Sequence, residues 1–482
     1  MELSFEQIED IGLKYVRDML EPASPYGVKR LRAEGFYGPS RQAELERELD
    51  NIGLLREALA SDREGVAGLR QELAGLKELG ATIERCADGP LSEVELFELT
   101  AFCLRLHRLI PAAEALPGYG SLEGCRFASV DAALAVLDPG GSGRLSFYIE
   151  DARSPELLRA RSEKREAERL LRRPGADIEA LNARRAAAVR DEERALAELR
   201  AEISGSLRPL LPALRQNMDA AGRLDAAIAK AELSFRYPSC RPALGGDTLL
   251  FEGALSPKIA AALEARGRRF TPIDAEMPRG VTVLTGANMG GKSVALQTVA
   301  LNICLALSGC FVFCTQAKVP VFERVELINR DFSSAEGGLS SFGGEIVRFN
   351  AAAARLGGGG LSFIAMDEFA RGTNAAEGAA IARGVVRYLA DKNAVTLLAT
   401  HYDGAAAFAA RHYQVRGLRS MGENLPAGGE DALRNIENAM DYGLIPVGPE
   451  APCPRDALRI CRVLGLPEEI MKDIETGDGA GE

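Results

Sequence analysis

The sequence predicts an α + α/β protein, in which a helical first part is followed by an α/β part with a mainly parallel sheet. Three observations lead to this prediction. Apolar residues recur at three- and four-residue spacings before residue 236, short β-type runs alternate with helical stretches after it, and a glycine-rich motif joins one such run to a helix. We therefore expect a helical domain over residues 1–235, an α/β domain over 236–475 and a disordered tail over 476–482.

The composition is that of a folded, acidic protein. The chain has 482 residues, with 58 Lys and Arg against 69 Asp and Glu, and a net charge of −11. This charge argues against a protein that coats nucleic acid by bulk attraction, although it leaves room for a local basic surface. The nine cysteines include no Cys-x-x-Cys pair, so neither a zinc site nor a disulfide framework is indicated. The first residues do not form a signal peptide and no stretch reads as a membrane span, so we expect a cytoplasmic protein without membrane contact.

The first part of the chain has helical periodicity interrupted by one turn. Residues 139–143 are rich in proline and glycine, and we expect the following residues, 144–149, to form a short strand. Before that turn, over about residues 41–78, one face of the predicted helix carries Leu45, Leu49, Ile52, Leu55 and Leu59.

A helical arm is predicted over about residues 154–205. Ser154 and Pro155 have the residue types of a helix start, and a charged helix runs from there to about Arg173. After Pro174-Gly175 a second helix runs to about 204, so the two should pair antiparallel. Either the arm is a solvated helical hairpin, or its basic residues contact phosphates: Arg153, Arg159, Arg161, Lys164, Arg165, Arg169, Arg172 and Arg173.

Four runs after residue 236 are predicted as strands, and one of them precedes a phosphate-binding motif. The runs are 281–285, 311–313, 361–366 and 395–400. The first is followed by a G-x-x-x-x-G-K-S motif and then by a helix, which is the context that a P-loop requires. Its glycines let backbone N–H groups converge on phosphates, its lysine neutralises phosphate charge, and its serine hydroxyl can bind Mg²⁺. The motif comprises Gly286, Ala287, Asn288, Met289, Gly290, Gly291, Lys292 and Ser293.

Acidic and basic candidates follow the other predicted strands. Asp367 and Glu368 come directly after the 361–366 run. Beside a P-loop, Asp367 would hold Mg²⁺ through water and Glu368 would act as general base on the attacking water. His401 follows the 395–400 run, where a histidine can sense the γ-phosphate; we assign no role to His412 or to the remaining histidine. Between these motifs, a glycine-rich loop over 336–345 offers hydroxyl donors to a phosphate.

These motifs together resemble the ATPase domain of the MutS mismatch-repair family. The resemblance lies in Thr285–Ser293, Asp367–Asn374 and Ala399–Tyr402, and less specifically in Pro22–Gly27 of the helical part, which is similar to the family's core and lever domain. It implies an ABC-type P-loop ATPase that uses ATP and Mg²⁺ and works as a head-to-tail homodimer. It also implies nucleotide contacts from Ser340, acting across the dimer, from the adjacent Ser341, and from Phe270, which would stack on adenine.

Two outputs for such an ATPase are compatible with the sequence. The chain contains no Phe-x-Glu triplet and is shorter than the family's mismatch-reading members, so we expect that the mismatch-reading domain is absent. We favour an ATP-driven switch that remodels a protein partner, similar to the reactivase of lysine 5,6-aminomutase, a cobalamin-dependent radical enzyme. The alternative is a clamp in DNA repair or recombination that binds duplex DNA without reading mismatches. A catalytically inert scaffold is disfavoured because Lys292, Ser293, Asp367, Glu368 and His401 are all present.

Overall fold

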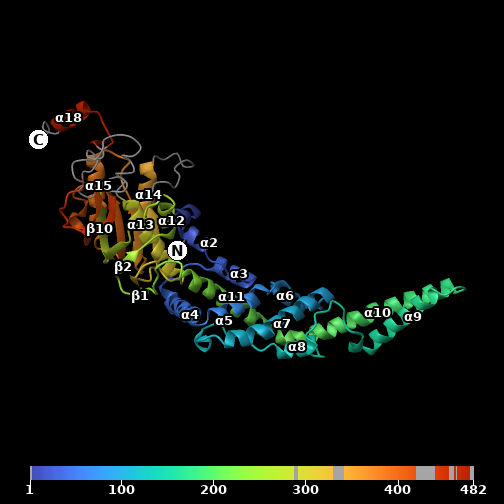
Figure 1. The fold of residues 1–482 in the computed structure, drawn as a ribbon. Coiled ribbons are helices and arrows are strands. Elements are labelled where there is room, and N and C mark those ends of the chain that lie inside the picture. The colour runs from blue at the N-terminus through green and yellow to red at the C-terminus, as the bar shows by residue number, and fades with distance from the viewer. Residues whose placement is uncertain are drawn as a thin grey trace. The chain divides into compact units, whose positions relative to one another are not determined.

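The computed structural model describes residues 3–286, 291–328, 341–418, 440–454, 461–462 and 464–477 (Figure 1). It confirms the predicted fold class, with a helical part and an α/β part whose sheet is mainly parallel. The chain groups into two compact units. The sheet unit comprises 1–21, 34–53 and 230–482, and the helical unit comprises 22–33 and 54–229. The predicted domain boundary after residue 235 stays a prediction.

The helical unit is built from helices with one apolar face each. The predicted helical stretch over 41–78 is two helices, because Asp62 ends the first and its side chain accepts a hydrogen bond from the Gly65 amide at the start of the second. The helices with residues in this unit are α3 (Pro25–Ala33), α4 (Gln42–Ser61), α5 (Arg63–Ala74), α6 (Gly80–Asp88), α7 (Glu93–Glu114), α8 (Asp131–Leu137), α9 (Pro155–Leu171), α10 (Ile178–Leu207) and α11 (Leu211–Leu233).

The strand predicted over 144–149 is wrong. A strand requires a partner for its backbone groups, and the described part of the helical unit offers none. The segment instead folds on itself, since the Ser146 hydroxyl accepts a hydrogen bond from the Tyr148 amide at 3.0 Å. Its aromatic side chains pack on helices, with the Phe147 ring centroid 3.6 Å from that of Phe97 and the guanidinium of Arg161 3.7 Å from the centre of the Tyr148 ring.

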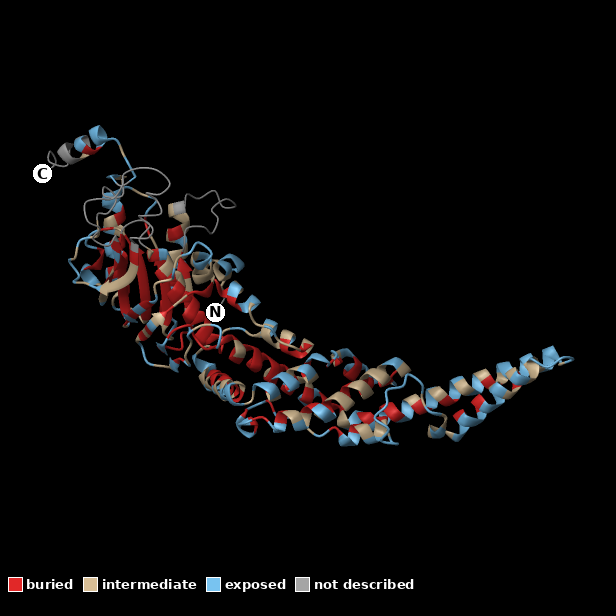
Figure 2. Cartoon of the chain, viewed as in Figure 1, coloured by how far each residue is buried: buried red, intermediate tan, exposed pale blue. Residues whose placement is uncertain are grey.

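The helical arm is confirmed as an antiparallel pair of α9 and α10. The side chain of Ser154 caps α9 by accepting from the Leu157 amide, as its sequence position predicts. Ion pairs then join the two helices along their length: Glu163 to Arg184 at 2.6 Å, and Lys164 to Glu192 at 2.8 Å. Figure 2 shows that most of this arm is exposed between its few buried positions.

Most basic residues that were candidates for phosphate contact already have partners within the helical unit. Arg161 is only 5% exposed and pairs with Asp151 and Glu192. Other members of the set also have carboxylate or backbone carbonyl partners: Lys164 with Glu192, Arg165 with Asp151, Arg169 with Glu166, and Arg153 with the carbonyls of Val136 and Leu137. Arg159, Arg172 and Arg173 are exposed. Five of the eight candidates therefore already have partners within the helical unit.

A buried aspartate anchors the segment that carries the Pro22–Gly27 resemblance. Asp225 of α11 is fully buried and accepts three hydrogen bonds, from the amides of Ala23 and Ser24 at 2.8 and 2.7 Å and from the Ser24 hydroxyl at 2.6 Å. Gly27 is required opposite it, because a Cβ there would lie 2.1 Å from an Asp225 oxygen. The motif thus fixes the start of α3 against α11.

We predict that Asp225→Ala lowers the free energy of unfolding by about 3 kcal/mol, because it leaves two buried amides and a hydroxyl without their acceptor. Chemical denaturation followed by circular dichroism measures this change. Asp219→Ala is the matched control, since Asp219 lies on the same helix but is exposed, and it should change stability by less than about 0.5 kcal/mol. Equal effects of the two substitutions would contradict the role assigned to Asp225.

The described part of the sheet unit contains two sheets. The larger has six strands in the order β10-β9-β4-β8-β7-β6, of which only β10 is antiparallel to its neighbour. The smaller has four strands in the order β1-β5-β2-β3. The strands are β1 (Ala243–Leu244), β2 (Leu249–Ala254), β3 (Ile273–Met277), β4 (Gly280–Thr285), β5 (Gln316–Val319), β6 (Arg324–Ile328), β7 (Ser362–Asp367), β8 (Ala394–Thr400), β9 (Arg411–Leu418) and β10 (Met440–Pro446).

Three of the four predicted strands are confirmed as β4, β7 and β8, which are neighbours in the larger sheet and buried along nearly all of their length (Figure 2). The fourth, over 311–313, is not a strand but a single bridge between Val312 and Cys240. The run is apolar because it is buried beside α13, and burial alone does not make a ladder. The helices of this unit are α1 (Phe5–Asp10), α2 (Leu13–Asp18), α12 (Pro257–Glu264), α13 (Lys292–Leu307), α14 (Ser341–Arg355), α15 (Ala375–Leu389) and α18 (Glu468–Gly477).

Helix α13 is held at both ends. It begins at Lys292, a few residues after the end of the interior strand β4. Just after its last residue, the carbonyl of Ser308 accepts a hydrogen bond from buried Lys230 at 3.2 Å. The Lys230 ammonium also pairs with Glu34 at 2.6 Å. Although α13 is apolar and buried, no helix in the part of the chain that the structure describes is long and apolar enough to span a bilayer.

Candidate functional site

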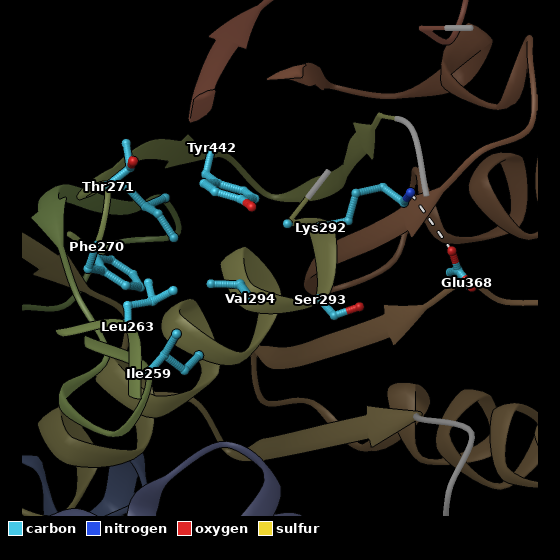
Figure 3. A pocket seen from close by; sticks show the side chains of 11 residues that line it. Ile259, Leu263, Phe270, Thr271, Lys292, Ser293, Val294, Glu368 and Tyr442 are labelled. Carbon is cyan, nitrogen blue, oxygen red and sulfur yellow. Dashed lines mark ion pairs between the residues drawn. The ribbon is translucent and has the colours of Figure 1, made fainter. Parts of the chain in front are cut away.

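A cavity of about 310 Å³ lies at the N-terminal end of α13 (Figure 3). Apolar and aromatic side chains gather at one end of it, and Lys292 and Glu368 lie at the other. This volume and this mixture of surfaces suit a small organic ligand with one anionic end. The lining residues are Ile259, Leu263, Phe270, Thr271, Ile273, Gly291, Lys292, Ser293, Val294, Glu368 and Tyr442.

Lys292 supplies a buried positive charge at the anionic end. Its Nζ donates to the carbonyl of Gly286 at 2.8 Å and lies 3.8 Å from a carboxylate oxygen of Glu368. Burial lowers the pKa of Lys292, while the neighbouring carboxylates of Glu368 and Asp367 favour its charged form. Because the helix begins at this residue, the α13 N-terminus adds partial positive charge at the same point. An anion that enters here therefore meets two sources of attraction.

Gly291 and Tyr442 form a close contact that no sequence motif indicated. Gly291 has φ of +88°, and a Cβ there would lie 2.5 Å from the Tyr442 ring, so only glycine fits. The Tyr442 hydroxyl accepts a hydrogen bond from Arg268 at 3.0 Å. Phe270, predicted to stack on adenine, lines the same end of the cavity (Figure 3). Tyr442 was missed because β10 reaches the P-loop only through the folded sheet.

The predicted magnesium residues lie together. The side chain of Ser293 lies beside the carboxylate of Asp367, which ends β7, and favours its charged form. The Oδ1 atom of Asp367 is buried without a hydrogen-bond partner, and burial raises the pKa of this group. A buried oxygen of this kind beside a serine hydroxyl fits a hard cation, which would supply the missing partner. Within the described ranges no three His, Cys, Asp or Glu side chains form a metal cluster.

We predict that Asp367→Asn weakens the apparent Mg²⁺ affinity of ATP hydrolysis by about 10- to 100-fold, because it removes the negative charge beside Ser293. Titration of the hydrolysis rate with Mg²⁺ measures the change. Asp391→Asn is the control, since Asp391 is exposed in the turn before β8. An unchanged Mg²⁺ midpoint in Asp367→Asn would contradict the metal role of this residue.

Glu368 occupies a strained position at the end of β7. Its φ is +50°, in the left-handed region that residues with a side chain seldom adopt. Its amide donates to the carbonyl of Ala399 at 2.9 Å. The carboxylate pairs with Lys292 on one side and with Arg371 on the other. Strain of this kind is typical of residues whose orientation matters for function.

Two histidines lie near the end of β4: His401, for which a role at the γ-phosphate stays a prediction, and His412. His401 directly follows β8, whose last residue, Thr400, pairs with Thr285 at the end of β4, and its ring centroid lies 4.4 Å from that of Tyr402. His412, to which no role was assigned, is buried and joins the P-loop strand to the C-terminal segment. Its Nδ1 donates to the carbonyl of Gly448, and its Nε2 accepts from the Thr285 hydroxyl, each at 2.8 Å. Burial lowers the pKa of His412, which keeps the ring neutral as this pairing requires.

The structure therefore brings part of the predicted site together. Phe270, Gly291, Lys292, Ser293 and Glu368 line one cavity, and Asp367 joins it through Ser293. Gly286 contacts Lys292 through its carbonyl. Ser341 is the first residue of α14. The other predicted contacts lie outside the described residues: Ala287, Asn288, Met289, Gly290 and Ser340.

Most of the residues of this site lie in a segment that matches a known protein family. Residues 282–444 match the family described as MutS domain V. The chain is 30% identical over 290 residues to DNA mismatch repair protein MutS of Natronomonas pharaonis, covering 59% of this chain and 32% of that protein. It is 32% identical over 303 residues to Endonuclease MutS2 of Thermomicrobium roseum, covering 59% and 35%. It is 35% identical over 191 residues to DNA mismatch repair protein MutS of Thermus aquaticus, covering 39% and 22%.

These similarities support the predicted resemblance to the MutS family. The segment that matches domain V contains β4, α13, β7 and β8, which position Lys292, Ser293, Asp367 and Glu368. Phe270 lies outside it. The chain spans about a third of the length of the first curated relatives that it matches.

Proposed function

We propose that this chain is a MutS-family ATPase that binds ATP with Mg²⁺ and hydrolyses it to ADP and phosphate. The observation that carries this proposal is the single cavity in which a P-loop lysine, a candidate general base and an aromatic wall face one another. The match to MutS domain V over the same strands and helix supports it.

Each residue has a distinct task in this proposal. Phe270 and Tyr442 enclose the adenine ring of ATP, and Lys292 with the α13 N-terminus binds the phosphates. Ser293 and Asp367 hold Mg²⁺, which when bound neutralises charge that develops on the phosphates. Glu368 accepts a proton from the attacking water, and for this its carboxylate must exchange its contact with Arg371 for one with that water.

Two further assignments follow from the family resemblance. The proposed active form is a head-to-tail homodimer, in which the loop that carries Ser340 and Ser341 completes the site of the partner subunit. His401, which directly follows the strand residue paired with Thr285, is proposed to contact the γ-phosphate. Sedimentation of the protein with and without ATP tests the dimer, and a monomer under both conditions would contradict it.

For the partner of the ATPase we propose duplex DNA. The names of the relatives, mismatch repair protein and endonuclease, favour DNA and give no support to an aminomutase reactivase. One observation keeps protein remodelling as a second candidate: several basic side chains of the arm are already paired with carboxylates of the arm or of the adjacent Asp151.

The two candidates are separated by what stimulates ATP hydrolysis. If DNA is the partner, we expect duplex DNA to raise the rate at about 50 mM salt and to lose this effect at a few hundred millimolar. Replacing exposed Arg172 and Arg173 by alanine should weaken DNA binding, while the same loss of charge at Lys14 and Lys29 should not. Stimulation by a cobalamin-dependent aminomutase, with none by DNA, would favour remodelling and contradict the DNA proposal.

A further inference from the structure

The loop after β7 contains a second strained residue, whose peptide groups are held from two sides. Ala370 has φ of +65°, a value that residues other than glycine seldom adopt, and it follows Glu368 by two residues. Such a conformation persists only where the surrounding structure holds it. The contacts that hold Ala370 therefore also fix the backbone that orients Glu368.

Two buried side chains make these contacts. Glu345 of α14 is 3% exposed, and its carboxylate accepts a hydrogen bond from the Ala370 amide at 3.1 Å. Tyr402, which follows β8 and is 6% exposed, donates its hydroxyl to the Ala370 carbonyl at 3.0 Å. Glu345, Ala370 and Tyr402 thus form what we call the Ala370 clasp.

The packing around the clasp leaves little room for another arrangement. A Cβ at Gly378 would lie 2.2 Å from the Tyr402 hydroxyl and 3.0 Å from the Ala370 carbonyl oxygen. A Cβ at Gly372 would lie 2.9 Å from the side chain of Phe342, which belongs to the first turn of α14. The start of α14 therefore contacts the loop twice, through Phe342 and through Glu345.

We propose that Glu345 is a positioning residue for Glu368. Through the Ala370 amide it ties the orientation of the candidate base to the position of α14, the helix that begins at Ser341. A shift of α14 would be transmitted to Glu368 through one hydrogen bond and one packing contact. This inference rests on the proposed ATPase function, and it adds a residue that acts through the backbone and not on the nucleotide.

The test compares four variants in ATP binding, ATP hydrolysis and hydrogen exchange. Glu345→Ala removes the acceptor, Glu345→Gln keeps an acceptor oxygen without the charge, and Tyr402→Phe removes the donor on the other side. Glu326→Ala is the matched control, because Glu326 contacts the opposite end of α14 through Arg355 at 2.8 Å. Mass spectrometry of the 368–374 peptide measures exchange of the Ala370 amide directly, with no nucleotide present.

We expect Glu345→Ala to lower kcat by about 10- to 100-fold while the ATP Kd changes by less than about threefold, and to speed exchange in the 368–374 peptide. Glu345→Gln should restore both to near wild-type values, Tyr402→Phe should lower kcat, and Glu326→Ala should change neither. If Glu345→Ala does not fold, Tyr402→Phe decides the kcat prediction.

Several outcomes would overturn the proposal. A wild-type kcat in Glu345→Ala or Tyr402→Phe would do so, and so would a Glu345→Gln protein as slow as Glu345→Ala. Failure of the proposed function is distinguishable, because wild-type protein would then not hydrolyse ATP at all. The exchange measurement would still show whether the clasp exists.

Discussion

Lys292→Ala should weaken the affinity of the protein for ATP by about 100- to 1000-fold. The substitution removes a buried ammonium, 4% exposed, from the anionic end of the cavity and leaves the carboxylates of Glu368 and Asp367 facing the incoming phosphates. Loss of attraction and new repulsion act in the same direction. Equilibrium titration with a fluorescent ATP analogue measures the change.

The control for this variant is Lys14→Ala, which removes an exposed lysine that pairs only with Asp18 on its own helix. It should bind ATP as the wild type does, since surface pairs contribute little. Circular dichroism establishes that Lys292→Ala is folded. A folded Lys292→Ala protein with wild-type affinity would show that the ligand of the cavity does not place its anionic end at Lys292.

Glu368→Gln should bind ATP but hydrolyse it about 100- to 10,000-fold more slowly than wild type. The amide keeps the size of the side chain, so the cavity wall and the strained backbone are retained, but it cannot accept a proton from water. Binding is expected to be unchanged or tighter, because a negative charge near the phosphates is removed.

Phosphate release under single-turnover conditions measures the hydrolysis step of this variant. Glu377→Gln is a suitable comparison, because this glutamate lies in the first turn of α15 and accepts a hydrogen bond from Thr373. It should hydrolyse ATP at near the wild-type rate. Wild-type hydrolysis by Glu368→Gln would remove Glu368 as the general base.

The parts of the fold that the sequence predicts are those with local signals. Strands β4, β7 and β8 are continuous apolar runs, and a parallel strand buried on both faces needs that composition. The runs at 144–149 and 311–313 have similar residue types, but neither finds a neighbouring strand with which to form a ladder. Strand formation depends on that partner, which lies far away in the chain.

The same distinction applies to the site. Lys292, Ser293, Asp367 and Glu368 belong to motifs with fixed spacing, so their roles are proposed from sequence. Tyr442 and His412 reach the P-loop through sheet pairing. Glu345 acts through a single backbone amide 25 residues away in the chain. Contacts of this kind leave no periodicity in the sequence, and only the folded structure displays them.

The most direct test of the proposed function is phosphate release from ATP by the purified protein with and without Mg²⁺. We expect Mg²⁺-dependent release by the wild type, and release by neither Lys292→Ala nor Glu368→Gln, although the latter still binds ATP. Release by both variants at the wild-type rate would contradict the proposed function, because the activity would then not arise from the cavity at the start of α13.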